Sequence, residues 1–151
     1  MAGIDLTTRV REVPDFPEPG VGFKDISPLL LDPEALRQAV GELADWTRER
    51  KADLVLGAEA RGFWLGPAIA VEAGCGFVAA RRPGKLPPET VSATYALEYG
   101  KNTLEVAADA IAGLVEHLGG AVVGVNFVLE LSFLGGRKRL AGYDLFSLIT
   151  Y

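Results

Sequence analysis

The segment that decides the fold begins with Asp53-Leu-Val-Leu-Gly57 and ends with Gly76-Phe-Val-Ala-Ala80. Both ends are short apolar runs without polar alternation, which is typical of strands buried in a parallel sheet. Between them, a polar loop at 57–62 leads into an apolar stretch around Trp64 to Ala73, and this stretch predicts a helix. The whole segment therefore predicts a βαβ unit with a right-handed crossover, which is the building block of an α/β fold.

The sequence on both sides of this unit continues the alternation of helices and strands. Upstream, Asp32-Pro33-Glu34 combines an N-cap, a proline of the first turn and an acid, and it predicts the start of a helix that reaches Lys51. Downstream, the hydrophobic spacing predicts a β-hairpin over 91–106, a helix from Ile111 to Leu118, and strands over Ala121–Leu131 and Tyr143–Ile149.

Composition excludes several classes of protein. The chain has 151 residues, enough for one domain with a hydrophobic core, and its net charge of −5 is unfavourable for non-specific nucleic-acid binding. Cys75 is the only cysteine and His117 the only histidine, which excludes an internal disulfide and the common zinc sites. The N-terminus lacks the pattern of a signal peptide, and Ala121–Leu131 is too short to span a bilayer. We therefore expect a cytoplasmic domain with no nucleic-acid or membrane partner.

Two loops carry residues suited to an anionic ligand. The loop at 57–62 joins a strand to a helix N-terminus, where backbone N–H groups and the helix dipole favour an anion, and Arg61 adds a charge-assisted donor. The loop after Ala80 places Arg81, Arg82 and Lys85 in an otherwise acidic chain. Taken singly, each loop is more typical of a solvated surface turn than of a ligand site, and Glu98 is typical of a solvated residue on the polar face of its strand. The residues alone leave these alternatives open.

Six segments, taken in order, resemble the adenine phosphoribosyltransferases of the type I phosphoribosyltransferase family. These segments are Phe16–Leu30 (Phe-Pro-Glu-Pro-Gly-Val-Gly-Phe-Lys-Asp-Ile-Ser-Pro-Leu-Leu), Ala60–Phe63, Gly84–Pro87, Tyr95–Gly100, Leu134–Leu140 and Phe146–Tyr151. The resemblance implies a central, mostly parallel sheet flanked by helices, with an N-terminal hood and a β-hairpin flap. It divides the single domain, residues 1–151, into a hood at 13–30, a core at 32–80, a flap and hairpin at 81–106, and a C-terminal core at 109–151.

The same resemblance implies purine salvage: adenine and phosphoribosyl pyrophosphate (PRPP) react to give AMP and pyrophosphate, with Mg²⁺ bound to PRPP and no protein metal ligand. Homodimers are typical of the family. The residues to which the resemblance gives substrate-binding roles are Val21, Gly22, Phe23, Lys24, Glu59, Ala60, Arg61, Arg82, Lys85 and Tyr99, and the catalytic roles fall to Glu98, Arg61 and Lys85.

The implied roles divide between the base and the pyrophosphate. Phe23 stacks on adenine within a hood made by 21–24, and Glu98, accompanied by Tyr99, handles the proton of the adenine imidazole ring. The loop at 57–62 takes the pyrophosphate with Arg61 as its cation, whereas Lys85 and its neighbours belong to a flap that closes over PRPP.

One departure from the family concerns the PRPP signature, which is a strand, two adjacent acids and a Thr-Gly-Gly-Thr-like loop. No such segment stands near 111–113, where about 20 residues are missing. Either the printed sequence omits them, which predicts a chain break near Ala112, or the polypeptide lacks them, which exposes the backbone edges of neighbouring strands. We favour the first explanation. The second favours a different function, that of a non-catalytic purine- or nucleotide-binding relative. A generic anion-binding domain would leave the match at Phe16–Leu30 unexplained.

Overall fold

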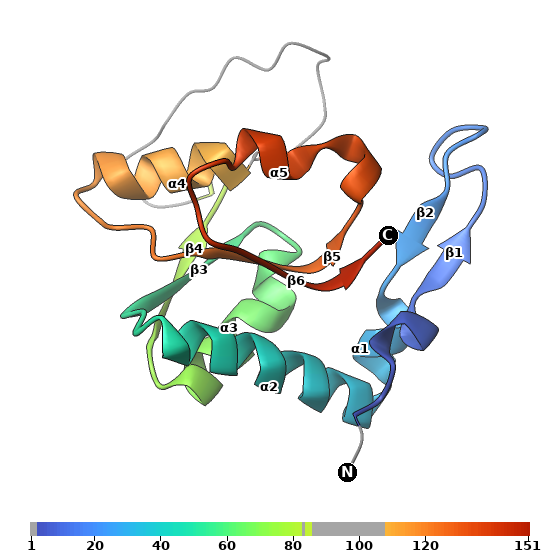
Figure 1. Cartoon of the computed structure of the whole chain (residues 1–151), viewed down its shortest axis with the longest axis horizontal. Helices are drawn as coiled ribbons and strands as arrows, with labels where there is room; N and C mark the ends of the chain where they lie inside the picture. Colours follow the sequence, from blue (N-terminus) through green and yellow to red (C-terminus); the bar gives the residue numbers. More distant parts are fainter. Residues whose placement is uncertain (1–2, 83, 86–107) are drawn as a thin grey trace.

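The computed structural model describes residues 3–82, 84–85 and 108–151, so the hairpin predicted at 91–106, with Glu98 and Tyr99, lies outside the described residues. The described elements form an α/β arrangement in which strands lie between two layers of helices (Figure 1). Helices α2 (Pro33–Glu49) and α3 (Gly62–Ala73) cover one side of the strands, and α4 (Ala108–His117) and α5 (Gly136–Arg139) lie on the other. The predicted fold class is confirmed.

The predicted βαβ unit is present. Strand β3 (Leu54–Ala58) pairs in parallel with β4 (Gly76–Ala80), with Leu54 opposite Gly76 and Ala58 opposite Ala80. Helix α3 connects them and ends at Gly74, whose φ of 78° is a left-handed conformation that suits glycine. The amide of Gly74 donates to the last carbonyls of the helix, which stops the helix just before β4.

The parallel strands form two separate pairs instead of the single central sheet that we expected. Strand β5 (Val125–Glu130) pairs in parallel with β6 (Leu145–Thr150), and no ladder joins this pair to β3 and β4. Among the described elements, no further strand pairs with either the β3–β4 pair or the β5–β6 pair, so no ladder connects the two pairs. Helix α4 is continuous across 111–113, so the chain shows no break near Ala112.

Helix α2 supports both pairs of strands. Asp32 caps it by accepting hydrogen bonds from the amides of Glu34 (2.9 Å) and Ala35 (3.2 Å), as the sequence predicted. The side chains that α2 and α3 bury together are Leu43, Ala44, Leu65 and Ile69, and those of the strands that pack against them are Val55, Val128, Phe146 and Leu148. A single apolar cluster thus contacts β3, β5 and β6.

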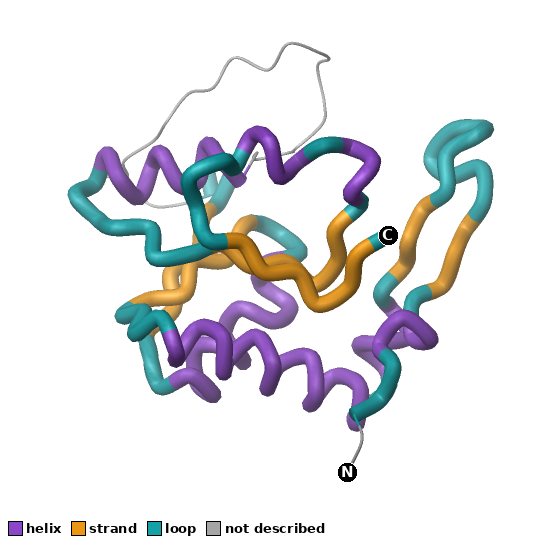
Figure 2. Tube along the Cα trace, in the orientation of Figure 1, coloured by secondary structure: helices purple, strands orange, loops and turns teal. Residues whose placement is uncertain are grey.

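The N-terminal segment contains regular elements that hydrophobic spacing did not predict (Figure 2). Strand β1 (Arg11–Val13) pairs antiparallel with β2 (Phe23–Asp25), and the short helix α1 (Ser27–Leu31) follows. Two 3₁₀ turns lie at Leu6–Arg9 and Ser132–Leu134. Strands of three residues are too short to show a period of two, so pairing partners define them, and the sequence does not reveal these partners.

None of the helices in the described ranges is long and apolar enough to cross a bilayer.

Asp25 makes the stability of this N-terminal hairpin dependent on pH. Hydrogen bonds from the hydroxyl (2.6 Å) and amide (2.8 Å) of Ser27, together with the Arg11 guanidinium, lower the pKa of Asp25 from 3.8 to about 2. Because the folded pKa is below the unfolded one, this stabilisation is complete above pH 3.8 and is lost as the pH falls toward 2. We expect Asp25→Asn to flatten the decline of Tm between about pH 5 and about pH 2. Asp53→Asn, at an exposed carboxylate, is the matched control, and equal pH profiles for wild type and Asp25→Asn would contradict the assignment.

Candidate active site

The loop between β3 and α3 is a tight turn at the carboxyl end of a parallel strand, which is where ligands bind in open α/β sheets. The peptide bond between Glu59 and Ala60 is cis, and no side chain caps the N-terminus of α3. A Cβ atom on Gly57 would lie 2.6 Å from the carbonyl oxygen of Gly62, so the two ends of the loop approach as closely as their backbones allow. The start of α3 therefore presents its dipole to this loop without a competing side chain.

Glu59 ties this loop to the residues that follow β4. Its carboxylate accepts hydrogen bonds from the amide of Arg82 (2.9 Å) and from Nε of Arg81 (3.3 Å), and its own amide donates to the carbonyl of Ala80 (2.9 Å). The Arg82 amide, followed by the Arg81 guanidinium, lowers the pKa of Glu59, so the carboxylate stays ionised. Glu59 therefore has arginine partners within its own chain. Its contacts bring together the two loops that the sequence singled out, the loop at 57–62 and the loop after Ala80.

Three of the predicted cations stay available for a ligand. Arg61, Arg82 and Lys85 are exposed, and within the described residues none of their side chains donates a hydrogen bond or forms an ion pair. The amide of Lys85 donates to the carbonyl of Arg82 (3.2 Å), which keeps these two cations in one turn. Arg81 differs, because it is paired with Glu59 and lies 5.8 Å from the centre of the Phe63 ring. An anion at this loop would therefore meet three side-chain cations that form no ion pair within the described residues, beside the ionised carboxylate of Glu59.

The hood predicted at 21–24 lies on the β1–β2 hairpin. The Phe16 and Phe23 rings meet edge to face with centroids 5.2 Å apart, and Phe16 remains 51% exposed. Lys24 is occupied by its neighbours: its Nζ lies 3.0 Å from the Glu12 carboxylate and 4.4 Å from the centre of the Tyr151 ring. The hairpin thus offers aromatic surface, while Lys24 anchors it to the C-terminus.

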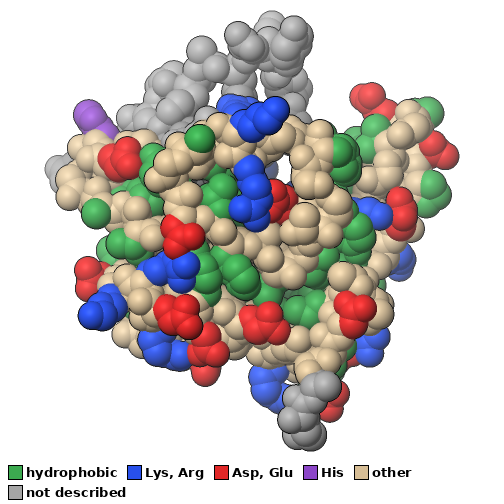
Figure 3. All heavy atoms as spheres, in the orientation of Figure 1, with side chains coloured by type: hydrophobic (Ala, Val, Ile, Leu, Met, Phe, Trp, Pro, Cys, Tyr) green, Lys and Arg blue, Asp and Glu red, His purple; other side chains and the backbone are tan. Residues whose placement is uncertain are grey.

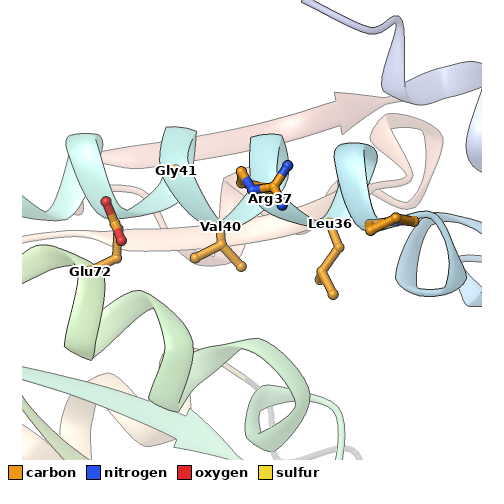
Figure 4. Close-up of a pocket in the computed structure, with 6 residues that line it drawn as sticks. Leu36, Arg37, Val40, Gly41 and Glu72 are labelled. Carbon is orange, nitrogen blue, oxygen red and sulfur yellow. The ribbon is translucent and has the colours of Figure 1, made fainter.

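Within the described ranges, no ladder joins the β1–β2 hairpin of the hood to β3 and β4, and Figure 1 shows the hairpin standing apart from them. A hollow of about 560 Å³ lies elsewhere, between α2 and α3 (Figure 4), and its lining residues are Pro33, Leu36, Arg37, Val40, Gly41 and Glu72. None of these is a predicted site residue. A cavity common to Phe23, Arg61, Lys85 and Glu98 therefore stays a prediction, because Glu98 lies outside the described residues.

A second carboxylate that the sequence did not single out lies at the end of β5. Glu130 accepts hydrogen bonds from Nε and Nη2 of Arg137 (2.8 Å each) and from the Ser147 hydroxyl (2.6 Å). Arg137, followed by Ser147, lowers the pKa of Glu130. The signal in the sequence was an acid that ends an apolar strand. Figure 3 shows Lys and Arg side chains gathered over α5, whose residues include Arg137, Lys138 and Arg139.

No group of three or more His, Cys, Asp or Glu residues in the described segments is placed to hold a metal ion. The nearest carboxylate to the free cations, Glu59, already has its partners.

Comparisons with known proteins all lead to one family, although no model of a protein family matches the chain. Adenine phosphoribosyltransferase of Desulfitobacterium hafniense (strain Y51) is 48% identical over 173 positions, which cover 100% of both chains. The crystal structure of the adenine phosphoribosyltransferase from Thermoanaerobacter pseudethanolicus superposes with a TM-score of 0.87 at 42% identity, over 97% of this chain and 98% of that one. The Saccharomyces cerevisiae enzyme, in complex with D-DIAB and adenine, has a TM-score of 0.80 at 33% identity, over 95% and 96% of the two chains.

The lengths of the aligned chains differ by about the amount that the missing signature predicted. The alignment with the Desulfitobacterium relative has 173 positions, whereas this chain has 151 residues, so 22 positions of the relative have no counterpart here. An identity of 48% over the full length of both chains nevertheless establishes that the two proteins are homologous. The chain belongs to the adenine phosphoribosyltransferases, pentosyl-transferring enzymes of purine salvage with the type I phosphoribosyltransferase fold.

Proposed function

We propose that this chain transfers the phosphoribosyl group of PRPP to adenine, giving AMP and pyrophosphate. The observation that carries the proposal is the 48% identity to an adenine phosphoribosyltransferase along the whole chain. The yeast neighbour, whose structure contains adenine, supports adenine as the base. The non-catalytic alternative is not favoured by these comparisons, because they consistently return enzymes.

The pyrophosphate leaving group is assigned to the loop between β3 and α3. Bond breaking at the anomeric carbon transfers negative charge to pyrophosphate, and preorganised donors and cations stabilise that charge in the transition state. Arg61, Arg82 and Lys85 are exposed cations without a described partner, and the uncapped start of α3 adds its dipole. Glu59 and Ala60 shape the loop, and Glu59 acts through Arg81 and Arg82 by holding them beside it.

Adenine is assigned to the hairpin. The Phe23 ring provides a flat apolar face, supported at its edge by Phe16. The amide and carbonyl of Val21 are bonded within the hairpin to Glu18 and Phe16, so the edge of the base is assigned to the backbone at Gly22. Lys24 fixes the hairpin through Tyr151 and Glu12. In this proposal Lys24 positions the hood and does not contact the base.

Glu98 is assigned the proton that adenine loses from its imidazole ring when the new bond to carbon forms, and Tyr99 accompanies it. Mg²⁺ enters bound to PRPP, where it neutralises phosphate charge. We also propose a homodimer and a cytoplasmic location, as the family resemblance implies.

Incubation of the purified chain with labelled adenine, PRPP and Mg²⁺ tests the proposal, with AMP and pyrophosphate as the expected products. Hypoxanthine and guanine in place of adenine serve as controls for the choice of base. The proposal would be contradicted if the chain formed no AMP above background and also formed none after its missing positions had been restored.

Arg61→Ala is expected to weaken pyrophosphate binding about 10-fold or more, because one charge-assisted contact contributes about 1.5–3 kcal/mol. Isothermal titration of the chain with pyrophosphate measures this. Arg37→Ala is the matched control, since Arg37 is also an exposed arginine, on α2, and its side chain has no ion pair in the described part of the protein. Similar losses for both variants would indicate a general charge effect and would remove Arg61 from the site.

A further inference from the structure

Two ion pairs of the β1–β2 hairpin stay inside the hairpin. Arg11 pairs with Asp25, which lies opposite it in the ladder. Glu12 and Lys24 are also opposite each other, and Nζ of Lys24 lies 3.0 Å from the Glu12 carboxylate. Pairs of this kind join the two strands to each other. They do not fix the place of the hairpin on the rest of the protein.

Lys24 has a second contact, and this one leads out of the hairpin. Its Nζ lies 4.4 Å from the centre of the Tyr151 ring, which is within the range of a cation–π interaction. The Lys24 side chain is only 18% exposed, and a cation–π contact is stronger where the cation is desolvated. Figure 1 shows the end of the chain, which is Tyr151, beside β2. Because Tyr151 directly follows β6, the contact links the hood to the C-terminal strands.

Tyr151 is itself held firmly by its backbone and its side chain. Its amide donates to the carbonyl of Glu130 (3.0 Å), and its carbonyl accepts from the amide (2.8 Å) and the hydroxyl (2.5 Å) of Ser132. The side chain packs against the buried cluster that includes Leu29 and Ile149. The ring is thus a fixed support at the carboxyl ends of β5 and β6, the end of a parallel sheet at which ligands bind.

We propose that Tyr151 is a positioning residue for adenine: its ring holds Lys24, and through Lys24 it holds the hood at the carboxyl ends of β5 and β6. The inference rests on the proposed function, which assigns adenine to Phe23 and to the backbone at Gly22. These two residues directly precede Lys24, so a shift of Lys24 displaces them. A hairpin that is ordered before the base arrives loses less conformational entropy on binding. Tyr151 does not touch the substrate in this proposal.

Hydrogen exchange tests whether Tyr151 holds the hairpin, without any need for a substrate. Tyr151→Leu removes the ring and keeps an apolar side chain, and it should make the ladder amides of β1 and β2 exchange about 3–10-fold faster than in wild type. Tyr151→Phe keeps the ring face and should stay within about two-fold of wild type. The β3–β4 amides should not change in either variant. Tyr143→Leu is the matched control, at a half-buried tyrosine whose hydroxyl donates to Glu116 of α4 (3.1 Å).

Calorimetric titration of the same proteins with adenine tests the consequence for binding. The Kd for adenine should rise about 3–10-fold in Tyr151→Leu, whereas the Kd for pyrophosphate, which is assigned to the loop at 57–62, should not change. A general loss of stability would instead weaken both. In a chain that already carries Lys24→Met, adding Tyr151→Leu should weaken adenine binding by less than about two-fold, because two residues that act through one contact are not additive.

Three results would overturn the inference. The first is unchanged exchange of the β1 and β2 amides in Tyr151→Leu. The second is an equal loss of adenine affinity from Tyr151→Leu with and without Lys24→Met, because Tyr151 would then act on the base by another route. The third is faster exchange with no loss of adenine affinity. If the wild-type chain binds no adenine, the assignment of the base to the hood fails, and hydrogen exchange alone decides whether Tyr151 holds the hairpin.

Discussion

Gly57→Ala is expected to destabilise the protein by about 2–3 kcal/mol, because an added methyl group has no room in the turn between β3 and α3. Its Cβ atom would lie 2.6 Å from the carbonyl oxygen of Gly62 and 2.8 Å from Cε2 of Phe77. The oxygen belongs to the backbone of the first residue of α3, so it cannot rotate away as a flexible side chain would. Relief requires α3 to move away from β3, and this movement would also weaken pyrophosphate binding.

Gly41→Ala is the matched control for this substitution. Gly41 lies in the interior of α2, and a Cβ atom there would meet no atom within 4 Å. Alanine is the better helix former, so this variant should gain about 0.5–1 kcal/mol. Urea unfolding of wild type and both variants measures the two effects with opposite signs. Equal stability of Gly57→Ala and wild type would show that β3 and α3 do not approach as closely as the structure has them.

The elements that the sequence predicted well are those whose signal is local. The βαβ unit has apolar strands and a helix that a left-handed glycine stops, and all of these signals lie within a few residues of the element that they define. The start of α2 was equally predictable, because Asp32 and Pro33 act on the first turn that follows them. Local chemistry of this kind does not depend on the rest of the fold.

The contacts that organise the site depend on residues far apart in the chain. Glu59 and Arg82 are 23 positions apart, and nothing in either local sequence names the other as a partner. Glu130 and Arg137 are only seven positions apart, yet the turn between them has no simple period, so their ion pair also escaped prediction. The family resemblance names the loops to which substrate binding is assigned, and that assignment stays a prediction. The structure adds that a contact between an acid and an arginine holds the end of each of two strands: Glu59 with Arg81 after β3, and Glu130 with Arg137 at the end of β5.

The separation of the parallel strands into two pairs was predictable only as a consequence of the absent PRPP signature. The absent signature, about 20 residues by resemblance, implied an exposed edge, and the structure shows such edges on β3 and β5 among the described elements. The sequence did not predict which strands would carry the exposed edges. Hydrophobic spacing indicates that a strand exists, but it does not indicate which strands pair with it.

Glu98→Ala is expected to lower the turnover of AMP formation by about 100-fold or more, because a positioned acid or base typically contributes a factor of about 10²–10⁴. The substitution removes the group proposed to take the adenine proton and leaves the pyrophosphate loop, with Arg61 and Lys85, in place. The KM for PRPP and the affinity for pyrophosphate should therefore change little, while kcat falls. Glu72→Ala is the matched control, at an exposed acid on α3 outside the site.

Steady-state rates should be measured with the chain that carries the restored positions, so that a low basal rate does not hide the loss. An ionising carboxylate produces a rise of kcat with pH, and Glu98→Ala should flatten this rise. Glu98→Gln should behave as Glu98→Ala does, since the amide cannot accept a proton near neutral pH. Full activity in either variant would assign the proton to another group. A parallel rise in the KM for PRPP would instead place Glu98 in binding of the activated sugar, because only a residue confined to the chemical step lowers kcat alone.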